Sequence, residues 1–346
     1  MKIGITYNLK DELSPEVILG EESYEEFDTP QTISAIQDIL AKHGHNIIRL
    51  GGGLGLIDTA AKERVDLVFN IAEGYGGRNR ESHIPSILEM LGIPYSGSDP
   101  LTLGLALDKV MTKKIALFAG IPTPRYGIAF TAKDLAAIQK KLRFPLITKP
   151  SWEGSSKGIY ITSRVMNDEA LAKSAEYLFK AYPGQPVLIE EYIEGRELAV
   201  GIMGNEDPKI IGVMEIVDKA SPGDDFFYSL ETKRDWLKKA DYISPPDLGQ
   251  LLDKHIRHYA LAAFREFGCR DMAKIDFRIS KNDRIYMLEV NPLPGLSPER
   301  SDMVIMAQKN GIKYEDLILS VLNHALSRTN ASRKTSARKP HFEISS

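Results

Sequence analysis

Three oxygen-bearing side chains, Asp276, Glu289 and Asn291, have the types and spacing of a metal site. They lie in residues 274–296, where apolar and polar residues alternate on both sides of a short polar turn, the pattern of two strands joined by a hairpin. Glu289 and Asn291 are two residues apart and therefore face the same side of their strand. An all-oxygen set suits Mg²⁺ beside phosphate groups. The alternative is a hairpin with solvent-facing acids, but the stiff Asn-Pro-x-Pro-Gly turn that follows favours the metal site.

Two lysines and a glycine- and serine-rich stretch could bind the phosphates that such a metal accompanies. Lys149 ends an expected strand, and SWEGSSKGI, residues 151–159, follows it. The backbone N–H groups of such a loop can fold over phosphates. The loop lacks the spacing of a Walker A motif and is a weak signal alone. Lys109 lies in a helix expected over residues 99–120, where a solvated lysine is the default interpretation.

Two further segments could complete a nucleotide site. An apolar strand over residues 186–191 runs into the acidic stretch YIEGRE, which suits the rim of an adenosine pocket, although a charged turn would look the same. Residues 218–246 are long, irregular and rich in aromatic side chains. Long loops inside a domain are usually functional or disordered, and the aromatic content favours a lid over a site.

The loop over residues 72–81, AEGYGGRNRE, could hold a charged substrate. It follows an expected strand at the end where open α/β sheets bind ligands, and it places Arg78 and Arg80 near Glu73 and Glu81. A solvated surface loop is the alternative.

The elements that must position these residues alternate between strand and helix through the first hundred residues, which predicts an α/β domain with a doubly wound parallel sheet. The Gly-rich run 51–55 lacks dinucleotide-binding spacing and is interpreted as a strand–helix turn. The later part mixes hairpins and helices, as α+β proteins do. We expect domains over residues 1–100, 101–189 and 190–326, followed by a basic, disordered tail over residues 327–346.

Composition narrows the class of protein. The chain has 346 residues, of which 43% are hydrophobic and 26% charged, and its net charge of −3 gives no reason to expect nucleic acid or a membrane surface as a partner. A single cysteine, Cys269, excludes an intramolecular disulfide and fits a reducing compartment. The N-terminus has no signal-peptide pattern and no apolar run is long enough for a membrane span, so we expect a cytoplasmic enzyme.

The order of these motifs resembles the D-alanine–D-alanine ligase family of ATP-grasp enzymes. The resemblance covers residues 1–326 and is strongest over residues 93–120, 146–159, 187–200 and 272–297. It implies an ATP-grasp fold preceded by a pre-ATP-grasp domain, ATP and two Mg²⁺ ions (Mn²⁺ as a substitute), and a homodimer.

The resemblance also implies roles for individual residues. Those expected to bind ATP are Lys109 and Lys149 at its phosphates, Glu153, Gly154, Ser155 and Ser156 in the covering loop, Glu190 at the adenine amino group, the backbone of Glu191 and Ile193 at the ring edge, Glu197 at the ribose, and Lys233 at the γ-phosphate. Those expected at the metals and the reacting groups are Asp276, Glu289 and Asn291 as ligands, Lys274 in place of a family arginine, Gly295 in the oxyanion hole, and Ser155 with Arg234.

The substrate half departs from the family pattern. The N-terminal glutamate that holds the ammonium of the first D-alanine is missing, and Glu12 lies out of register. Glu73-Gly74 stands in place of the family's His-Gly, and Arg234 in place of the lid tyrosine that partners the Ser155 hydroxyl. Arg300 and Ser301 lie where the second substrate's carboxylate is held.

These departures lead to three functional hypotheses. The added arginines, Arg78, Arg80, Arg234 and Arg300, suggest a larger or more acidic carboxylate substrate, because guanidinium groups bind carboxylates in a bidentate way. The first hypothesis is therefore an ATP-dependent carboxylate–amine ligase that works through an acylphosphate on a non-standard substrate. The second is a D-alanine–D-alanine ligase with a rebuilt site. The third is an ATP-binding regulator without ligation, against which the intact metal set argues.

Overall fold

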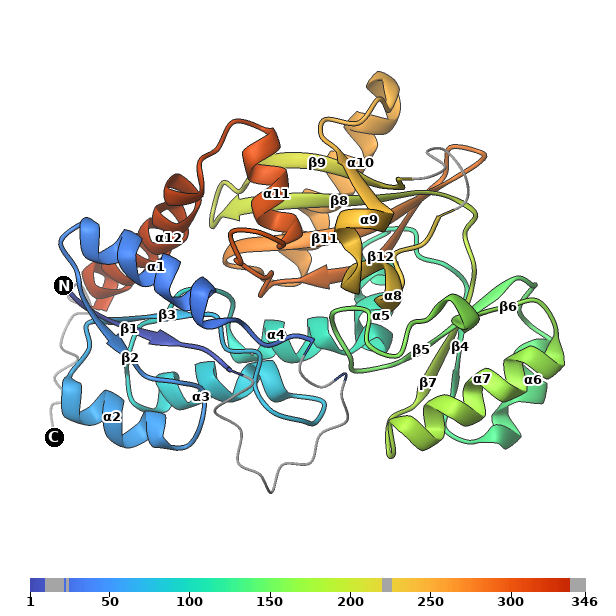
Figure 1. Cartoon of the computed structure of the whole chain (residues 1–346), viewed down its shortest axis with the longest axis horizontal. Helices are drawn as coiled ribbons and strands as arrows, with labels where there is room; N and C mark the ends of the chain where they lie inside the picture. Colours follow the sequence, from blue (N-terminus) through green and yellow to red (C-terminus); the bar gives the residue numbers. More distant parts are fainter. Residues whose placement is uncertain (10–21, 23–24, 220–225, 337–346) are drawn as a thin grey trace, which may run out of the picture.

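The computed structural model describes residues 1–9, 22, 25–219 and 226–336. The first part of the chain is a parallel sheet in the order β2-β1-β3 with helices on both faces (Figure 1). Apolar residues of one helix, α1, pack on one face of this sheet, and those of α2 and α3 pack on the other. Its elements are β1 (Lys2–Thr6), α1 (Pro30–Lys42), β2 (Asn46–Arg49), α2 (Gly55–Glu63), β3 (Leu67–Asn70) and α3 (His83–Met90). The parallel pairing agrees with the α/β prediction for this part of the chain.

The middle part contains two helices and a small antiparallel sheet in the order β4-β7-β5-β6. Helices α6 and α7 cover one face of this sheet (Figure 1). The elements are α4 (Pro100–Leu107), α5 (Lys109–Phe118), β4 (Tyr126–Ala129), α6 (Leu135–Gln139), β5 (Leu146–Pro150), β6 (Arg164–Val165), α7 (Asp168–Ala181) and β7 (Val187–Glu191).

The single helix predicted over residues 99–120 is wrong, because the chain breaks at Asp108. Asp108 has extended backbone angles, and its Oδ1 accepts hydrogen bonds from the N–H groups of Val110 and Met111, 2.9 and 3.0 Å away. It is therefore the N-cap of a new helix. Lys109 follows as the first residue of α5, where its side chain is buried.

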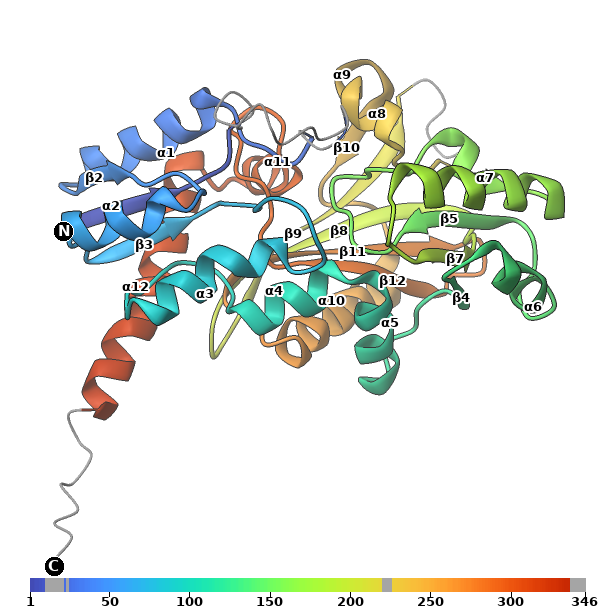
Figure 2. The same ribbon diagram turned by 90° about the horizontal axis from the view of Figure 1, so that it is seen from below.

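The last part is built on a five-stranded antiparallel sheet in the order β10-β9-β8-β11-β12. Helices α10 and α11 lie on opposite faces of it (Figure 2). Gly201 and Gly212 allow the close approach of α11, since a Cβ on either would lie within 2.9 Å of Met306. The elements are β8 (Gly195–Gly204), β9 (Lys209–Asp218), α8 (Leu230–Arg234), α9 (Trp236–Lys239), β10 (Ala240–Ile243), α10 (Gly249–Glu266), β11 (Asp271–Ser280), β12 (Ile285–Asn291), α11 (Asp302–Lys309) and α12 (Tyr314–Ser336).

Two further expectations require correction. Residues 218–246 are not structureless where they are described, since they hold α8, α9 and β10. The disordered tail does not begin at residue 327, because α12 continues to Ser336 and Arg328 forms an ion pair of 2.6 Å with the buried carboxylate of Asp271. Residues 337–346 and Glu12 lie outside the described residues. No helix in the described part of the chain has the length and apolarity that crossing a membrane requires.

Candidate active site

A cleft of about 460 Å³ lies between the four-stranded and the five-stranded sheets. Ile147 of β5 and Leu288 of β12 contribute apolar walls from opposite sides. Most residues with a predicted role line this cleft: Glu73, Lys109, Lys149, Glu153, Gly154, Ser155, Ser156, Glu190, Glu191, Ile193, Glu197, Lys233, Arg234, Lys274, Asp276, Glu289, Asn291, Gly295, Arg300 and Ser301. Arg78 and Arg80 do not line it.

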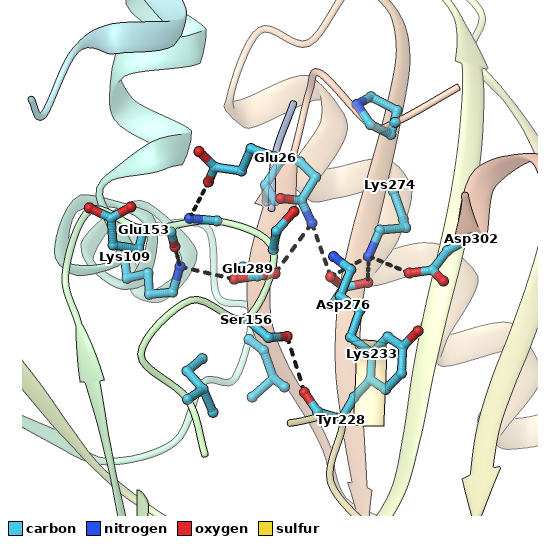
Figure 3. A pocket seen from close by; sticks show the side chains of 18 of the residues that line it. Glu26, Lys109, Glu153, Ser156, Tyr228, Lys233, Lys274, Asp276, Glu289 and Asp302 are labelled. Carbon is cyan, nitrogen blue, oxygen red and sulfur yellow. Dashed lines mark hydrogen bonds and ion pairs between the residues drawn. The ribbon is translucent and has the colours of Figure 1, made fainter. Parts of the chain in front are cut away.

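The hairpin β11–β12 brings the predicted metal ligands together. Asp276 pairs directly across the strands with Glu289. The side-chain amide of Asn291 lies 3.0 Å from the Asp276 carboxylate and 3.4 Å from that of Glu289. Lysine ammonium groups complete the array: Lys274 lies 2.6 Å from Asp276, and Lys109 lies 3.2 Å from Glu289 (Figure 3).

The two carboxylates of this array differ in how readily they ionise. Burial raises the pKa of Asp276 to about 7, although Lys274 partly offsets it. Burial also opposes ionisation of Glu289, but Lys109 and Lys274 outweigh it and hold the pKa of Glu289 below its usual range. Within the described residues, no three or more His, Cys, Asp and Glu side chains cluster as a metal site. The predicted set consists of two carboxylates and the Asn291 amide, whose nitrogen donates to both carboxylates here, and Mg²⁺ binding by this set stays a prediction.

The two predicted phosphate lysines come from different elements. Lys109 also donates to the backbone carbonyl of Glu153 in the loop (Figure 3). Lys149, on β5, lies 2.7 Å from Glu190 on β7. Burial opposes ionisation of Glu190, but Lys113 and Lys149 outweigh it and hold its pKa at about 2. Lys113 was missed from the sequence because it looks like an ordinary helix lysine, yet it is fully buried.

The loop after β5 contains two serines with unusual backbone angles. Ser155 and Ser156 both have left-handed backbone angles, with φ of 51° and 60°. Such conformations are strained in residues with side chains and are found at ligand-binding loops. The Ser156 hydroxyl donates to the carbonyl of Tyr228, 3.1 Å away (Figure 3), and the N–H of Leu230 donates to the carbonyl of Ile159, 2.8 Å away. The segment that carries Lys233 and Arg234 therefore rests directly on this loop.

Glu197, the predicted ribose ligand, has a partner that the sequence analysis missed. Arg278, on the neighbouring strand β11, lies 2.9 Å from the Glu197 carboxylate and donates to the carbonyl of Ile193. It also stacks 4.8 Å from the ring centre of Tyr192. Alternation along β11 puts Arg278 on the same side of the strand as Asp276. This alternation could have predicted from the sequence that Arg278 lines the site.

Two of the four added arginines do not face the cleft as predicted. Arg78 pairs with Asp108 at 2.6 Å. Arg80 is buried, and it binds Glu26 at 2.8 Å and the carbonyl of Trp152 at 2.6 Å. Both guanidinium groups thus have protein partners, and their direct contact with a substrate stays a prediction.

The other two arginines line the cleft. Arg234 pairs with Glu25 at 2.8 Å. Arg300 is exposed, and its guanidinium donates to the carbonyl of Phe27 over 3.5 Å. The Ser301 hydroxyl accepts a hydrogen bond of 2.8 Å from the backbone of Ser297.

Glu26 is another residue lining the cleft that the sequence analysis missed. Its carboxylate accepts a hydrogen bond of 2.8 Å from the N–H of Gly154 (Figure 3) and pairs with Lys157 at 2.8 Å. Burial opposes its ionisation, but Arg80 and Lys157 outweigh it and hold the pKa of Glu26 at about 2. Glu26 lies in an acidic stretch without periodicity, so no local pattern distinguishes it from solvated acids.

Two sheets that enclose a cleft with paired lysines, carboxylates and a covering loop define a nucleotide-dependent enzyme of the ATP-grasp fold. The family model described as "D-ala D-ala ligase C-terminus" matches residues 118–323. The chain is 33% identical over 315 residues to a D-alanine–D-alanine ligase of Carboxydothermus hydrogenoformans, covering 88% of this chain and 96% of the relative. It is 31% identical to the uncharacterized protein y4sG of Sinorhizobium fredii, covering 85% of each chain.

Solved structures agree in fold. The D-alanine–D-alanine ligase of Bacillus anthracis complexed with ATP has a TM-score of 0.70 at 23% identity, covering 96% of this chain and 99% of that one. The chain therefore belongs to the D-alanine–D-alanine ligase family. Members of this class are carbon–nitrogen bond-forming ATP-grasp ligases, and so is this enzyme.

Proposed function

We propose that this enzyme joins a carboxylate to an amine with ATP through an acylphosphate, and that at least one substrate is an amino acid or peptide-like compound other than free D-alanine. The observation that carries the proposal is the charge array of the cleft, in which Lys109 pairs with Glu289 and Lys274 with Asp276. A site that binds a nucleotide without transferring its phosphate does not require both the Lys109–Glu289 pair and the Lys274–Asp276 pair.

The chemistry follows from this array. A carboxylate is a poor electrophile, and phosphorylation converts it into an acylphosphate with a good leaving group, which an amine then attacks. Phosphoryl transfer depends on positioning and charge neutralisation more than on covalent help. Lys109, Lys149 and Lys233 would neutralise the phosphate oxygens, and Gly295 would contribute to the oxyanion hole. Mg²⁺ held by Asp276, Glu289 and Asn291 would polarise the transferred phosphoryl group.

The covering segment supports the same reaction. An acylphosphate hydrolyses when water reaches it, so a ligase must close its site. The Ser156–Tyr228 and Ile159–Leu230 hydrogen bonds join the loop after β5 to the segment that carries Lys233. This contact would exclude water from the phosphate end of the cleft.

The substrate proposal rests on the changed residues Glu73, Arg234 and Arg300, which all line the cleft. The names of the relatives favour a second candidate, ligation of two D-alanine molecules. Incubation with ATP, Mg²⁺ and a mixed amino-acid pool, followed by mass spectrometry of the products and measurement of ADP release, separates the candidates. D-alanyl-D-alanine as the main product, formed at enzymatic turnover, would exclude the non-standard substrate. ADP release that no substrate stimulates would favour an ATP-binding regulator. The homodimer stays a prediction, which the mass of the enzyme in solution would test.

A further inference from the structure

Two carboxylates, Glu73 and Glu81, line the cleft without a direct ion pair among the described residues. Neither side chain has a hydrogen-bond or ion-pair partner within the residues that the structure describes. Glu81 is only 8% exposed, and it reaches the cavity from a turn of 3-10 helix, Arg80–Ser82. The Ser82 hydroxyl fixes this turn to α4 by donating to the carbonyl of Pro100, 2.7 Å away.

The nearest cations already serve other partners. Arg80 directs its Nε and Nη2 to Glu26, at 3.2 and 2.8 Å, and its Nη1 to the carbonyl of Trp152. Lys157 lies 2.8 Å from Glu26 and 2.5 Å from Glu153. These two cations therefore balance Glu26 and Glu153 and leave Glu81 without a direct partner.

The pKa values of Glu73 and Glu81 agree with the lack of a direct cationic partner. Burial raises the pKa of Glu81 to about 7, with Arg80 opposing the rise and Glu26 adding to it. Burial raises the pKa of Glu73 as well, and the charges of Glu81 and Glu26 raise it further. Buried carboxylates are normally paired or hydrogen-bonded, and those without a partner shift towards the neutral form, which a bound cation would reverse. Two unpaired acids that line a cavity are therefore suited to a cationic ligand.

We propose that Glu73 and Glu81 form a subsite that binds an ammonium group of the amino-acid substrate. An ammonium group has three N–H donors and carboxylates accept them, so one such group can satisfy both side chains. This inference rests on the ligase function proposed above, and it reverses the expectation of a more acidic substrate, because an extra carboxylate here would meet like charges. Arg300 also lines this cleft, so the cleft offers a cation for the carboxylate group of an amino acid as well as carboxylates for its ammonium group.

The test compares ligands that differ only in one ammonium group. Binding of lysine against norleucine, and of alanine against propionate, is measured by calorimetry on the full chain, with both enantiomers of each chiral ligand and without ATP. We expect the ammonium-bearing member of at least one pair to bind 10-fold or more tightly. Glu81→Gln and Glu73→Gln should each remove most of this preference, whereas Glu169→Gln, an exposed control on α7, should retain it.

Equal binding within both pairs would overturn the subsite, and so would a preference that survives in both variants. Circular dichroism of each variant establishes that it is folded, and Glu73→Gln keeps the test decisive if Glu81→Gln does not fold. Calorimetry without ATP measures ligand binding and does not depend on ligation. If the enzyme ligated no amino acid, the proposed function would be wrong, but the binding test of the subsite would still be valid.

Discussion

The nucleotide side of the cleft and its substrate end differ in how their charges are balanced. On the predicted nucleotide side, buried charges lie opposite counter-charges in pairs such as Lys149–Glu190 and Arg278–Glu197. These residues lie on paired strands, which fix the spacing between side chains. At the predicted substrate end, Glu73 and Glu81 come from a loop and a short turn and form no direct ion pair with any residue that the structure describes.

This difference separates the two tasks of a ligase. Groups that act on the shared cofactor must hold one geometry, and a rigid sheet provides it. Groups that select the substrate can change on loops without disturbing the fold. The unpaired acids are consistent with a site in which the substrate, rather than the protein, completes the charge balance.

The largest effect is expected where a pair on the nucleotide side is broken. Arg278→Met should leave the Glu197 carboxylate buried without its guanidinium and lower the free energy of unfolding by about 3–5 kcal/mol. Urea denaturation measures this loss. The double variant Arg278→Met/Glu197→Gln should recover part of it, because the unpaired charge is gone. If Arg278→Met were as stable as the parent enzyme, the pairing would not matter to this side of the cleft.

Loss of a metal-side carboxylate should act on turnover rather than on stability. Glu289→Gln removes both a cation ligand and the counter-charge of Lys109, and we expect kcat to fall about 100- to 1000-fold, as it does when other enzymes lose a transition-state stabiliser. Steady-state ADP release measures it, with Glu169→Gln as the matched control. A change of less than threefold would remove Glu289 from the proposed chemistry.

Glu26 joins the two regions, and its contribution should depend on pH. Its pKa of about 2 lies below the ordinary value of 4.5, so its ion pairs stabilise the fold fully above pH 4.5 and lose this effect as the pH falls towards 2. Glu26→Gln should therefore cost up to about 3 kcal/mol at pH 7 and progressively less in acid. Denaturation of both proteins at pH 7 and pH 3 tests this. A difference that is constant with pH would contradict it.

The smallest effect is expected for Arg300, which is exposed at the edge of the cleft. If it contacts a substrate carboxylate, Arg300→Ala should raise KM for that substrate about 3- to 10-fold and leave KM for ATP unchanged, since charges at a rim contribute little. Substrate titrations at saturating ATP measure the change. An unaltered KM for every substrate would refute the contact.

Local sequence patterns were sufficient to predict the hairpin and the strands that border the cleft. Period-2 alternation predicted residues 274–290 as a strand pair, and β11 and β12 confirm it. The parallel sheet of the first part followed from alternating strand and helix signals. Predicted roles of individual side chains stay predictions, although most of these residues do line one cleft.

What the sequence did not predict depends on contacts between distant residues. The break at Asp108 needs its capping hydrogen bonds, which an apolar run over residues 99–120 hides. The positions of Arg78 and Arg80 depend on Asp108 and Glu26, which lie 30 and 54 residues away. A list of charged residues shows which side chains could bind a substrate, but only folding decides which remain available.

The ion pair between Arg328 and Asp271 bears on how the chain can be shortened. Asp271 has no exposed surface and also accepts a hydrogen bond of 2.8 Å from the N–H of Gly97. It begins β11, the strand that carries Lys274 and Asp276. A protein ended at residue 326 would leave the buried Asp271 carboxylate, at the first residue of β11, without the Arg328 guanidinium. Expression designs should therefore retain α12 through Arg328, so that trimming the C-terminus does not disturb the active site from a distance.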